Sequence, residues 1–334
     1  MEKIIIYGAG NTGKGAFYSL KNKYECFCFV DSDENKWGKY IEGIEIKSPS
    51  VLTQVNKMKV IIASIYWREI YEKVKEINDL DIAIYSPEVR FQLVDSTKKE
   101  LDSRTIDIGE LFEHKEITCK EMTFMLGGSG ILDYSFLKVI AEKYNCKTYL
   151  EIGTYIGESI NVLSDCCEKL YSITAEKESS YSMKYWCMNK NIPDYSERLA
   201  KSSKIKHFYC DSKKFDYSQI DDKIDLFFVD GDHSYNGVYT DTMRIFKIKH
   251  EKSIIIWHDF RGGDYAYNYD VVKAVKDALG EKFSNVYVTN KNMCGIYLPD
   301  EYINEYKLCE LKYEEDADLF TADVILQNCQ IDKI

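Results

Sequence analysis

Short apolar runs alternate with amphipathic, helix-like segments along most of the chain, and this alternation predicts two successive sets of strands. In the first half, the apolar runs predict strands at 3–7, 25–31, 59–64 and 81–87. Helix-like segments follow the first run, to about Lys23, and the third, as WREIYEKVKEIN. Strands that alternate with helices imply βαβ units and a parallel sheet.

The second half repeats the alternation after a stretch of different character. The charged stretch 96–125 shows no strong periodic pattern and is interpreted as a linker. Helical patterns at 131–144 and 270–283 flank strands predicted at 147–153, 169–176, 205–212, 223–232 and 253–260. Two further apolar segments, NVYVTN and CGIYLP, are typical of a closing antiparallel pair.

The predicted fold class is therefore α/β, with two tandem doubly wound Rossmann-like domains over 1–95 and 126–334. The sheet of the second domain is predicted to end in an antiparallel C-terminal strand pair. The length of 334 residues supports two domains, because it exceeds what one ordinary core accommodates. In such sheets, ligands bind at the carboxyl ends of the strands.

Charge and composition narrow the range of partners. A net charge of −11 without a basic stripe argues against a nucleic-acid partner, and no polybasic patch indicates membrane attachment. No stretch approaches the ~20 apolar residues of a membrane span, and MEKIIIYGAG does not have the pattern of a signal peptide. The 11 cysteines are scattered without a CxxC pair, which is typical of reduced thiols and predicts a cytoplasmic protein.

Chemically distinctive residues stand at the strand ends of the second half. The first strand ends in Glu151-Ile-Gly153-Thr154-Tyr-Ile-Gly157, and the third ends in Cys-Asp211-Ser212. Glycines let a backbone turn approach a ligand closely, and the adjacent helix N-terminus offers free N–H groups. Over roughly 120–300 the chain resembles the class I S-adenosylmethionine-dependent methyltransferases, whose first motif is E/D-x-G-x-x-x-G.

That resemblance implies a cofactor site. Its methionine and ribose side would be formed by Glu151, Gly153, Thr154 and Gly157, and its adenine side by Asp211 and Ser212. The second strand departs from the family, because Thr174 stands where an acid usually grips the ribose hydroxyls. Glu176, two residues later, is the nearest replacement. A tight strand–helix turn without a ligand is the alternative explanation of the glycines.

Acids and histidines follow the fourth and fifth strands of this half. VDGDHSYNGVYTD and the later IIIWHDF resemble a bacterial subgroup rich in small-molecule and sugar O-methyltransferases. The resemblance implies that His233 takes a proton and that Asp230, which also borders the cofactor, and Asp259 hold a divalent cation. His258 replaces the usual acid as a third ligand. Because imidazole suits Mg²⁺ poorly, this change either favours Mn²⁺ or Fe²⁺ or removes the metal. A polar turn and a buried histidine are the alternatives.

The first half carries a nucleotide-binding pattern of its own. Gly8, Gly10, Asn11 and Gly13 lie between a strand and a helix, and Asp31 ends the next strand, as in a dinucleotide fingerprint. The run VDSDENKWGKYIEGIEIKSPS resembles the N-terminal domains of bacterial sugar-modifying acetyltransferases, which implies a nucleotide or nucleotide sugar as ligand. A degenerate domain kept for substrate presentation, or for contact between copies in a homo-oligomer, is the alternative.

Together these patterns predict an S-adenosylmethionine-dependent O-methyltransferase that acts on a sugar, a nucleotide sugar or another polar hydroxylated small molecule, with or without Mg²⁺ or Mn²⁺. Two competing hypotheses stay open at this point. One is an NAD(P)-dependent oxidoreductase or epimerase centred on the first domain. The other is a non-catalytic nucleotide-sugar-binding protein.

Overall fold

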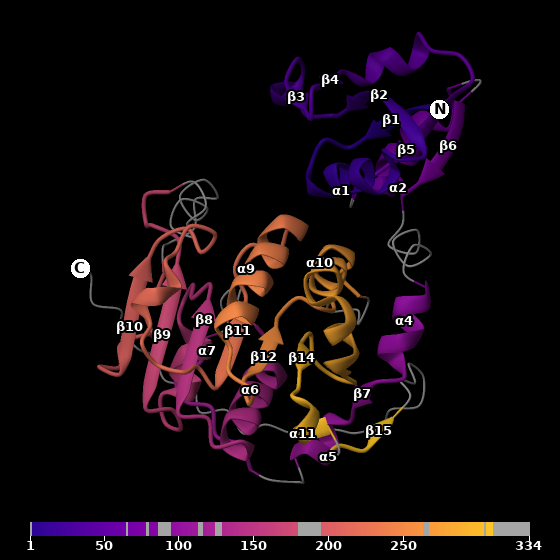
Figure 1. The fold of residues 1–334 in the computed structure, drawn as a ribbon. Helices are drawn as coiled ribbons and strands as arrows, with labels where there is room; N and C mark the ends of the chain where they lie inside the picture. The colour runs from indigo at the N-terminus through magenta and orange to yellow at the C-terminus, as the bar shows by residue number, and fades with distance from the viewer. Residues whose placement is uncertain are drawn as a thin grey trace. The chain divides into compact units, whose positions relative to one another are not determined.

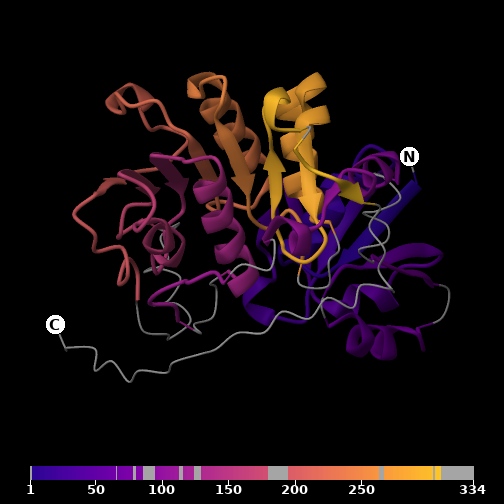
Figure 2. The ribbon, with the colours of Figure 1, turned by 90° about the horizontal axis from the view of Figure 1, so that it is seen from below.

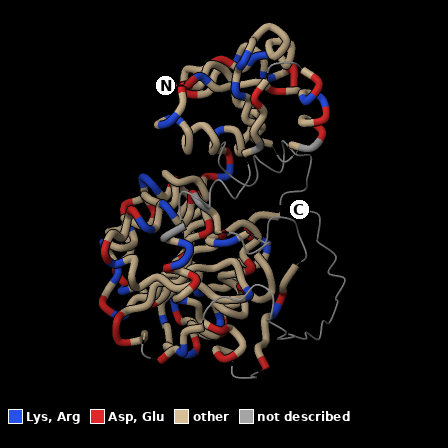
Figure 3. Tube along the Cα trace, turned by 90° about the vertical axis from the view of Figure 1, so that its right-hand side faces the viewer, with Lys and Arg blue, Asp and Glu red and all other residues tan. Residues whose placement is uncertain are grey.

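The chain divides into two compact units, Met1–Asp95 and Ser96–Ile334. The computed structural model describes residues 2–64, 66–77, 80–85, 95–112, 116–123, 129–179, 195–262, 267–303 and 305–309. Each unit has its own sheet and its own buried core (Figure 1). Lysine and arginine alternate with aspartate and glutamate along both units (Figure 3). Within the described residues, no helix has the length and apolar character that crossing a membrane requires.

Unit 1 is a six-stranded sheet in the order β3-β4-β2-β1-β5-β6. Its pairs are parallel except for the short β3–β4 hairpin. The elements are β1 (Glu2–Tyr7), α1 (Asn11–Leu20), β2 (Tyr24–Val30), η1 (Glu34–Lys36), β3 (Tyr40–Ile41), β4 (Ile44–Lys47), η2 (Pro49–Thr53), β5 (Met58–Ile62), α2 (Trp67–Val74) and β6 (Leu80–Ile84).

Alternate residues of β1 face opposite layers, as the period of two in a strand requires. Ile4 and Ile6 pack in one cluster with Leu20 of α1. Ile5 packs in a second cluster with Val74 of α2. The sheet is therefore covered on both faces, which explains why its central strands are continuous apolar runs.

Unit 2 is a nine-stranded sheet in the order β10-β9-β8-β11-β12-β14-β13-β7-β15. Its strands are β7 (Thr105–Ile106), β8 (Thr148–Ile152), β9 (Lys169–Thr174), β10 (Ile205–Tyr209), β11 (Leu226–Val229), β12 (Ile254–Trp257), β13 (Val286–Thr289), β14 (Gly295–Tyr297) and β15 (Leu308–Cys309). The helices are α4 (Asp95–Asp102), α5 (Ile108–Phe112), α6 (Ile131–Lys143), α7 (Glu158–Leu163), η3 (Tyr217–Gln219), α9 (Tyr235–Ile248), α10 (Tyr269–Leu279), η4 (Gly280–Asn285) and α11 (Asp300–Ile303).

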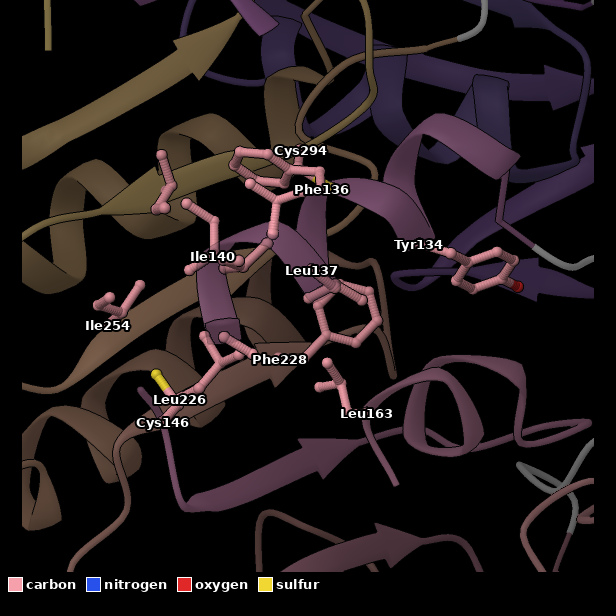
Figure 4. Packing of buried hydrophobic residues seen from close by; sticks show 14 of the residues in the cluster. Tyr134, Phe136, Leu137, Ile140, Cys146, Leu163, Leu226, Phe228, Ile254 and Cys294 are labelled. Carbon is pink, nitrogen blue, oxygen red and sulfur yellow. The ribbon is translucent and has the colours of Figure 1, made fainter. Parts of the chain in front are cut away.

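Helices cover both faces of the central strands of unit 2. On one face, Phe136 and Ile140 of α6 pack with Phe228 of β11 and Ile254 of β12 (Figure 4). α9 lies on the other face. Trp257 Nε1 of β12 donates a hydrogen bond to the hydroxyl of Thr242 in α9, at 2.9 Å. Figure 2 shows α9 and α10 side by side. The prediction of two tandem doubly wound domains is confirmed, and so is the closing antiparallel pair, which is β13 and β14.

Residues 96–125 differ from the predicted linker. Their described part carries α4, β7 and α5 inside unit 2, and β7 pairs with both β13 and β15. Arg104, just before β7, donates a hydrogen bond from Nη1 to the carbonyl oxygen of Phe283 at 2.7 Å. A strand of two residues is too short to show a periodic pattern in the sequence. Its pairing depends on the sheet edge that residues far along the chain provide.

Candidate functional site

The candidate site lies where the strand order of unit 2 reverses. The chain runs outward from β8 to β9 and β10, then returns to the other side of β8 with β11. Doubly wound sheets bind ligands at such a switch point, at the carboxyl ends of the strands. The ends are joined by backbone bonds, from Asp230 N to Ile152 O at 2.8 Å and from His258 N to Val229 O at 3.0 Å.

Gly153 makes the close approach of these two loops possible. It has a φ of +92°, and a Cβ added to it would lie 2.2 Å from the carbonyl oxygen of Asp230. Gly157 is similar, with a φ of +90° and a Cβ position 2.6 Å from the side chain of Ala200. Left-handed backbone without room for a side chain requires glycine at both positions. The glycines predicted from the motif therefore have a structural reason to be there.

The predicted acids and base meet in one cluster. His233 Nδ1 lies 2.8 Å from Asp259 Oδ2, and His233 Nε2 lies 3.3 Å from Asp230 Oδ1. One ligand atom from each of these three residues lies within 4.8 Å of the others. Asp259 is held in left-handed backbone, with a φ of +50°, which aspartate tolerates better than most residues. Side chains from β11 and β12 thus converge, as parallel strand ends predict.

His258, the residue after β12, also contacts the cluster and is almost fully buried. Its Nδ1 lies 3.3 Å from Asp230 Oδ1 and 3.5 Å from Asp259 Oδ2, and its Nε2 lies 3.6 Å from Asp133 Oδ2. Asp133 belongs to the first turn of α6 and is not among the site residues that the sequence predicts. Its only local signal is the spacing Gly-x-x-Asp, which indicates a helix cap: Gly130 N donates to Asp133 Oδ2 at 2.8 Å.

The opposite charges of the cluster shift its pKa values. Burial alone would lower the pKa of His233, but its hydrogen bonds with Asp230 and Asp259 raise it to about 10. Burial also opposes protonation of His258, yet Asp230 and the other carboxylates raise its pKa well above the ordinary value. Burial alone would raise the pKa of Asp230 and of Asp259, but the two imidazoles hold both below their usual range. Positive charge nearby therefore stabilises the ionised forms of Asp230 and Asp259.

The side chain of Glu151, near the end of β8, is completely buried. Its Oε2 accepts hydrogen bonds from Tyr149 Oη at 2.9 Å and Ser159 Oγ at 2.7 Å. Its Oε1 has no hydrogen-bond partner among the described residues. Burial raises the pKa of Glu151 to about 7, although the hydrogen bonds from Ser159, Thr154 and Tyr149 oppose the rise. Thr154 is also buried, and its Oγ1 lies 2.5 Å from Ser172 Oγ.

Glu151→Gln is expected to make unit 2 increasingly stable relative to the wild-type protein as the pH rises. A carboxyl whose pKa is about 7 when folded and 4.5 as a free side chain stabilises the fold fully below 4.5 and loses that contribution as the pH rises through 7. The difference amounts to about 3 kcal/mol at most, and about 1 kcal/mol of it falls between pH 6 and 8. Urea unfolding at several pH values measures it. The exposed Glu281→Gln is the control, and parallel pH profiles for wild type and Glu151→Gln would contradict the expectation.

The remaining predicted cofactor residues lie at the neighbouring strand ends. Glu176 is exposed in the turn after β9. Asp211 and Ser212 follow β10 and are half-buried, and Asp211 Oδ1 accepts a hydrogen bond from Lys213 N at 3.0 Å. The structure therefore places Glu176, Asp211 and Ser212 at the β9–β10 side of the sheet edge, and Asp230 at the β11 side.

In unit 1, two of the predicted glycines serve packing. A Cβ on Gly8 would lie 2.3 Å from Ala63 O, so Gly8 lets the loop approach the end of β5. A Cβ on Gly13 would lie 1.7 Å from Gly8 O, so Gly13 lets α1 pack closely on that loop. Gly10 has open space around its Cβ position, and Asn11 is exposed in the first turn of α1.

Asp31 is buried, and both of its oxygens are engaged within the protein. Oδ2 accepts hydrogen bonds from Ala9 N at 2.7 Å and from Lys36 Nζ at 3.0 Å, and Oδ1 accepts one from Asp33 N at 2.9 Å. The carboxylate therefore ties the glycine loop to the end of β2. A dinucleotide site needs the equivalent acid to hold ribose hydroxyls, and here the protein's own donors occupy those positions.

Two families match the chain, one in each unit. Residues 1–83 match the family described as C2185-like, N-terminal. Residues 150–260, which include every strand end of the candidate site, match the family described as a methyltransferase domain. The prediction of a methyltransferase domain in the second half of the chain is thus confirmed.

Individual relatives are distant. Uncharacterized protein R132 of Acanthamoeba polyphaga mimivirus is 24% identical over 160 residues, which are 47% of this chain and 71% of the viral protein. The Podospora anserina methyltransferase PaMTH1, solved with S-adenosylhomocysteine, is 14% identical, with a TM-score of 0.38 over 63% of this chain and 96% of that one. CalS11, a TDP-rhamnose 3'-O-methyltransferase of calicheamicin biosynthesis, is 9% identical, with a TM-score of 0.37 over 61% and 94%.

Proposed function

We propose that unit 2 transfers the methyl group of S-adenosylmethionine to a hydroxyl of a sugar, a nucleotide sugar or another polar hydroxylated small molecule in the cytoplasm. The observation that carries this proposal is the Asp230–His233–Asp259 cluster, which stands next to the Gly153 loop at the switch point of the sheet. An acceptor bound at the cluster and a cofactor bound over the glycine loop would lie side by side.

The residues divide into an acceptor side and a cofactor side. On the acceptor side, Asp230 and Asp259 hold the hydroxyl group while its oxygen attacks the methyl carbon in line. The new O–C bond forms as the S–C bond breaks, S-adenosylhomocysteine leaves, and His233 receives the hydroxyl proton. Much of the rate enhancement comes from alignment of two bound reactants.

On the cofactor side, the turn at Gly153 and Gly157 brings backbone next to the ligand. Glu151 Oε1, which is buried without a partner among the described residues, borders that turn. We propose that Glu176 and the pair Asp211 and Ser212 contact ribose and adenine, because they stand at the next two strand ends.

The acceptor side also suits a divalent cation. Its donors are two carboxylates and up to two imidazoles, and the carboxylates are paired in the cluster only with those imidazoles. A cation there would lower the pKa of an acceptor hydroxyl. His233 would then be released from its ion pairs and would be free to act as the base.

For unit 1 we propose a binding role for a nucleotide or nucleotide sugar. The N-cap residue of α1 is Gly10, which offers no side-chain cap, and the first turn of the helix holds no acid, so its first N–H groups are available to a phosphate. The engagement of Asp31 speaks against the oxidoreductase hypothesis, since that reaction needs a bound nicotinamide dinucleotide. Binding of substrate by unit 1 would raise its local concentration for unit 2 if the linkage lets both sites engage it.

Titration calorimetry on the full-length chain tests the central proposal. We expect S-adenosylmethionine and S-adenosylhomocysteine to bind with micromolar affinity, and a mass-spectrometric screen of nucleotide sugars with labelled cofactor to give a methylated product. Absence of binding heat at ~1 mM cofactor would reject the proposal, because it implies an affinity weaker than about −4 kcal/mol. Binding without a product would leave a cofactor-binding protein whose acceptor lies outside the screened compounds.

A further inference from the structure

The imidazole of His258 is buried, polar and poorly satisfied. Its side chain is 6% exposed, and neither ring nitrogen makes a hydrogen bond of good geometry with a described residue. Three carboxylates nevertheless surround it at 3.3 to 3.6 Å. Leaving a buried polar group without a partner costs about 1–3 kcal/mol, so such a group calls for a ligand that completes its environment.

The two ring nitrogens face different surroundings. Nδ1 points into the cluster, toward Asp230 Oδ1 and Asp259 Oδ2. Nε2 points away from it, toward Asp133 Oδ2. A metal-binding histidine presents one nitrogen to the ion while a carboxylate holds the other. Asp133 stands on that second side of His258, at an ion-pair distance of 3.6 Å that is longer than a hydrogen bond.

Asp133 is itself held rigidly by two segments far apart in the sequence. Its Oδ2 accepts from Gly130 N at 2.8 Å, at the start of α6, and its Oδ1 accepts from Met293 N at 2.9 Å. The thiol of Cys294 lies 3.6 Å from the same Oδ1. Its carboxylate is thus fixed between α6 and the segment before β14, with Oδ2 placed 3.6 Å from His258 Nε2.

We propose that Asp133 is a positioning residue that holds His258 with Nδ1 turned toward Asp230 and Asp259, and that these three donors bind a transition-metal dication in preference to Mg²⁺. The inference rests on the proposed function of the same cluster. His258 supplies the observation that the acids alone do not: a deeply buried side chain, without a hydrogen-bond partner among the described residues, that is aimed into the site.

Donor spacing and donor type both support the proposal. Neighbouring ligands around an octahedral ion with bonds of about 2.1 Å stand roughly 3.0 Å apart. The distances from His258 Nδ1 to the two carboxylate oxygens, 3.3 and 3.5 Å, need only a small contraction. Mg²⁺ prefers oxygen ligands, whereas imidazole nitrogen combined with carboxylate suits Mn²⁺, Fe²⁺, Co²⁺ and Zn²⁺. The resembled subgroup has an acid at the position of His258. The histidine therefore changes which metal the site prefers and does not abolish metal binding.

The test measures metal binding on the metal-stripped full-length chain, independently of turnover. We expect Mn²⁺ to bind at least tenfold more tightly than Mg²⁺ in equilibrium dialysis with elemental analysis. Pulsed electron paramagnetic resonance of bound Mn²⁺ in a His233→Ala background is expected to show coupling to a ¹⁴N nucleus, and His258→Glu in that background is expected to lose this signal and gain affinity for Mg²⁺.

Asp133→Asn is expected to weaken Mn²⁺ binding by 10- to 100-fold, as loss of a carboxylate behind a metal-bound histidine does elsewhere. The control is His250→Ala, which removes a histidine paired with Asp225 at 3.1 Å before β11 and should leave affinity unchanged. Thermal unfolding checks that each variant is folded, and His258→Glu tests the site without altering the α6 cap.

Equal affinity for Mn²⁺ and Mg²⁺, no nitrogen coupling, or unchanged binding in folded Asp133→Asn would overturn the inference. Cofactor calorimetry on the same samples separates the two proposals. If S-adenosylmethionine binds and the metal results fail, only the metal inference falls. If the metal binds and the cofactor does not, the proposed methyl transfer falls.

Discussion

His233→Ala is expected to lower kcat for methyl transfer by 10²- to 10⁴-fold, the usual loss when a positioned general base is removed. His233 is the half-exposed member of the cluster, with one ring nitrogen 2.8 Å from Asp259 and the other 3.3 Å from Asp230. It is therefore the imidazole that an acceptor at the strand ends can reach, whereas His258 is almost fully buried. Single-turnover assays with labelled S-adenosylmethionine give the rate of the chemical step directly.

Two controls separate loss of the base from loss of the fold. The affinity for S-adenosylhomocysteine should stay within about threefold of wild type, because His233 lies on the acceptor side. His250→Ala should retain activity, since His250 pairs with Asp225 at the opposite end of β11. Full activity of folded His233→Ala would contradict the role of base and would leave alignment by the two aspartates as the main source of rate.

Gly153→Ala is expected to destabilise unit 2 by about 2–4 kcal/mol and to weaken cofactor binding at least tenfold. Part of the cost, about 1–2 kcal/mol, comes from placing a non-glycine residue in left-handed backbone. The rest comes from the Cβ, which would stand 2.2 Å from Asp230 O and 2.8 Å from Gly231 Cα. Both of these are backbone atoms, so relief requires the β8 and β11 loops to separate. Urea unfolding and cofactor calorimetry measure the two effects.

Gly280→Ala is the matched control for the backbone term. Gly280 lies in the same unit with a φ of +55°, and nothing lies within 4 Å of its Cβ position. It should therefore lose stability through conformation alone and keep its cofactor affinity. Equal destabilisation by the two substitutions, with cofactor affinity kept in both, would show that the contact between the loops is not what makes Gly153 necessary.

Charge balance links the two sides of the proposed mechanism. Asp133, Asp230 and Asp259 surround His258, and His233 bridges two of them. Without a cation, the imidazoles supply the positive charge, and the raised pKa of His233 keeps it protonated near neutral pH. A protonated imidazole cannot accept a proton. A divalent ion on the carboxylates would take over that charge and leave His233 able to act.

Several features of this protein follow from its sequence alone, because their causes are local. Apolar runs buried on both faces predicted β8, β11 and β12 to within a few residues. Asp230 and His258 directly follow two such runs, so parallel strand ends bring them to one edge of a sheet. Gly8, Gly153 and Gly157 mark turns with a positive φ and no room for a Cβ, which only glycine can form. Chain length and the alternation of apolar runs with helix-like segments were also sufficient to predict two α/β domains.

Other features were decided only by the tertiary structure, because they depend on partners far apart in the chain. Asp133 has the local pattern of a helix cap, and only the packing of α6 on the sheet brings it to His258. Asp31 fits a ribose-binding acid by spacing, yet the fold turns its oxygens onto Ala9 and Lys36. Local periodicity determines which face a residue occupies. Which groups meet there depends on the strand order, and that order is set by burial of the whole core.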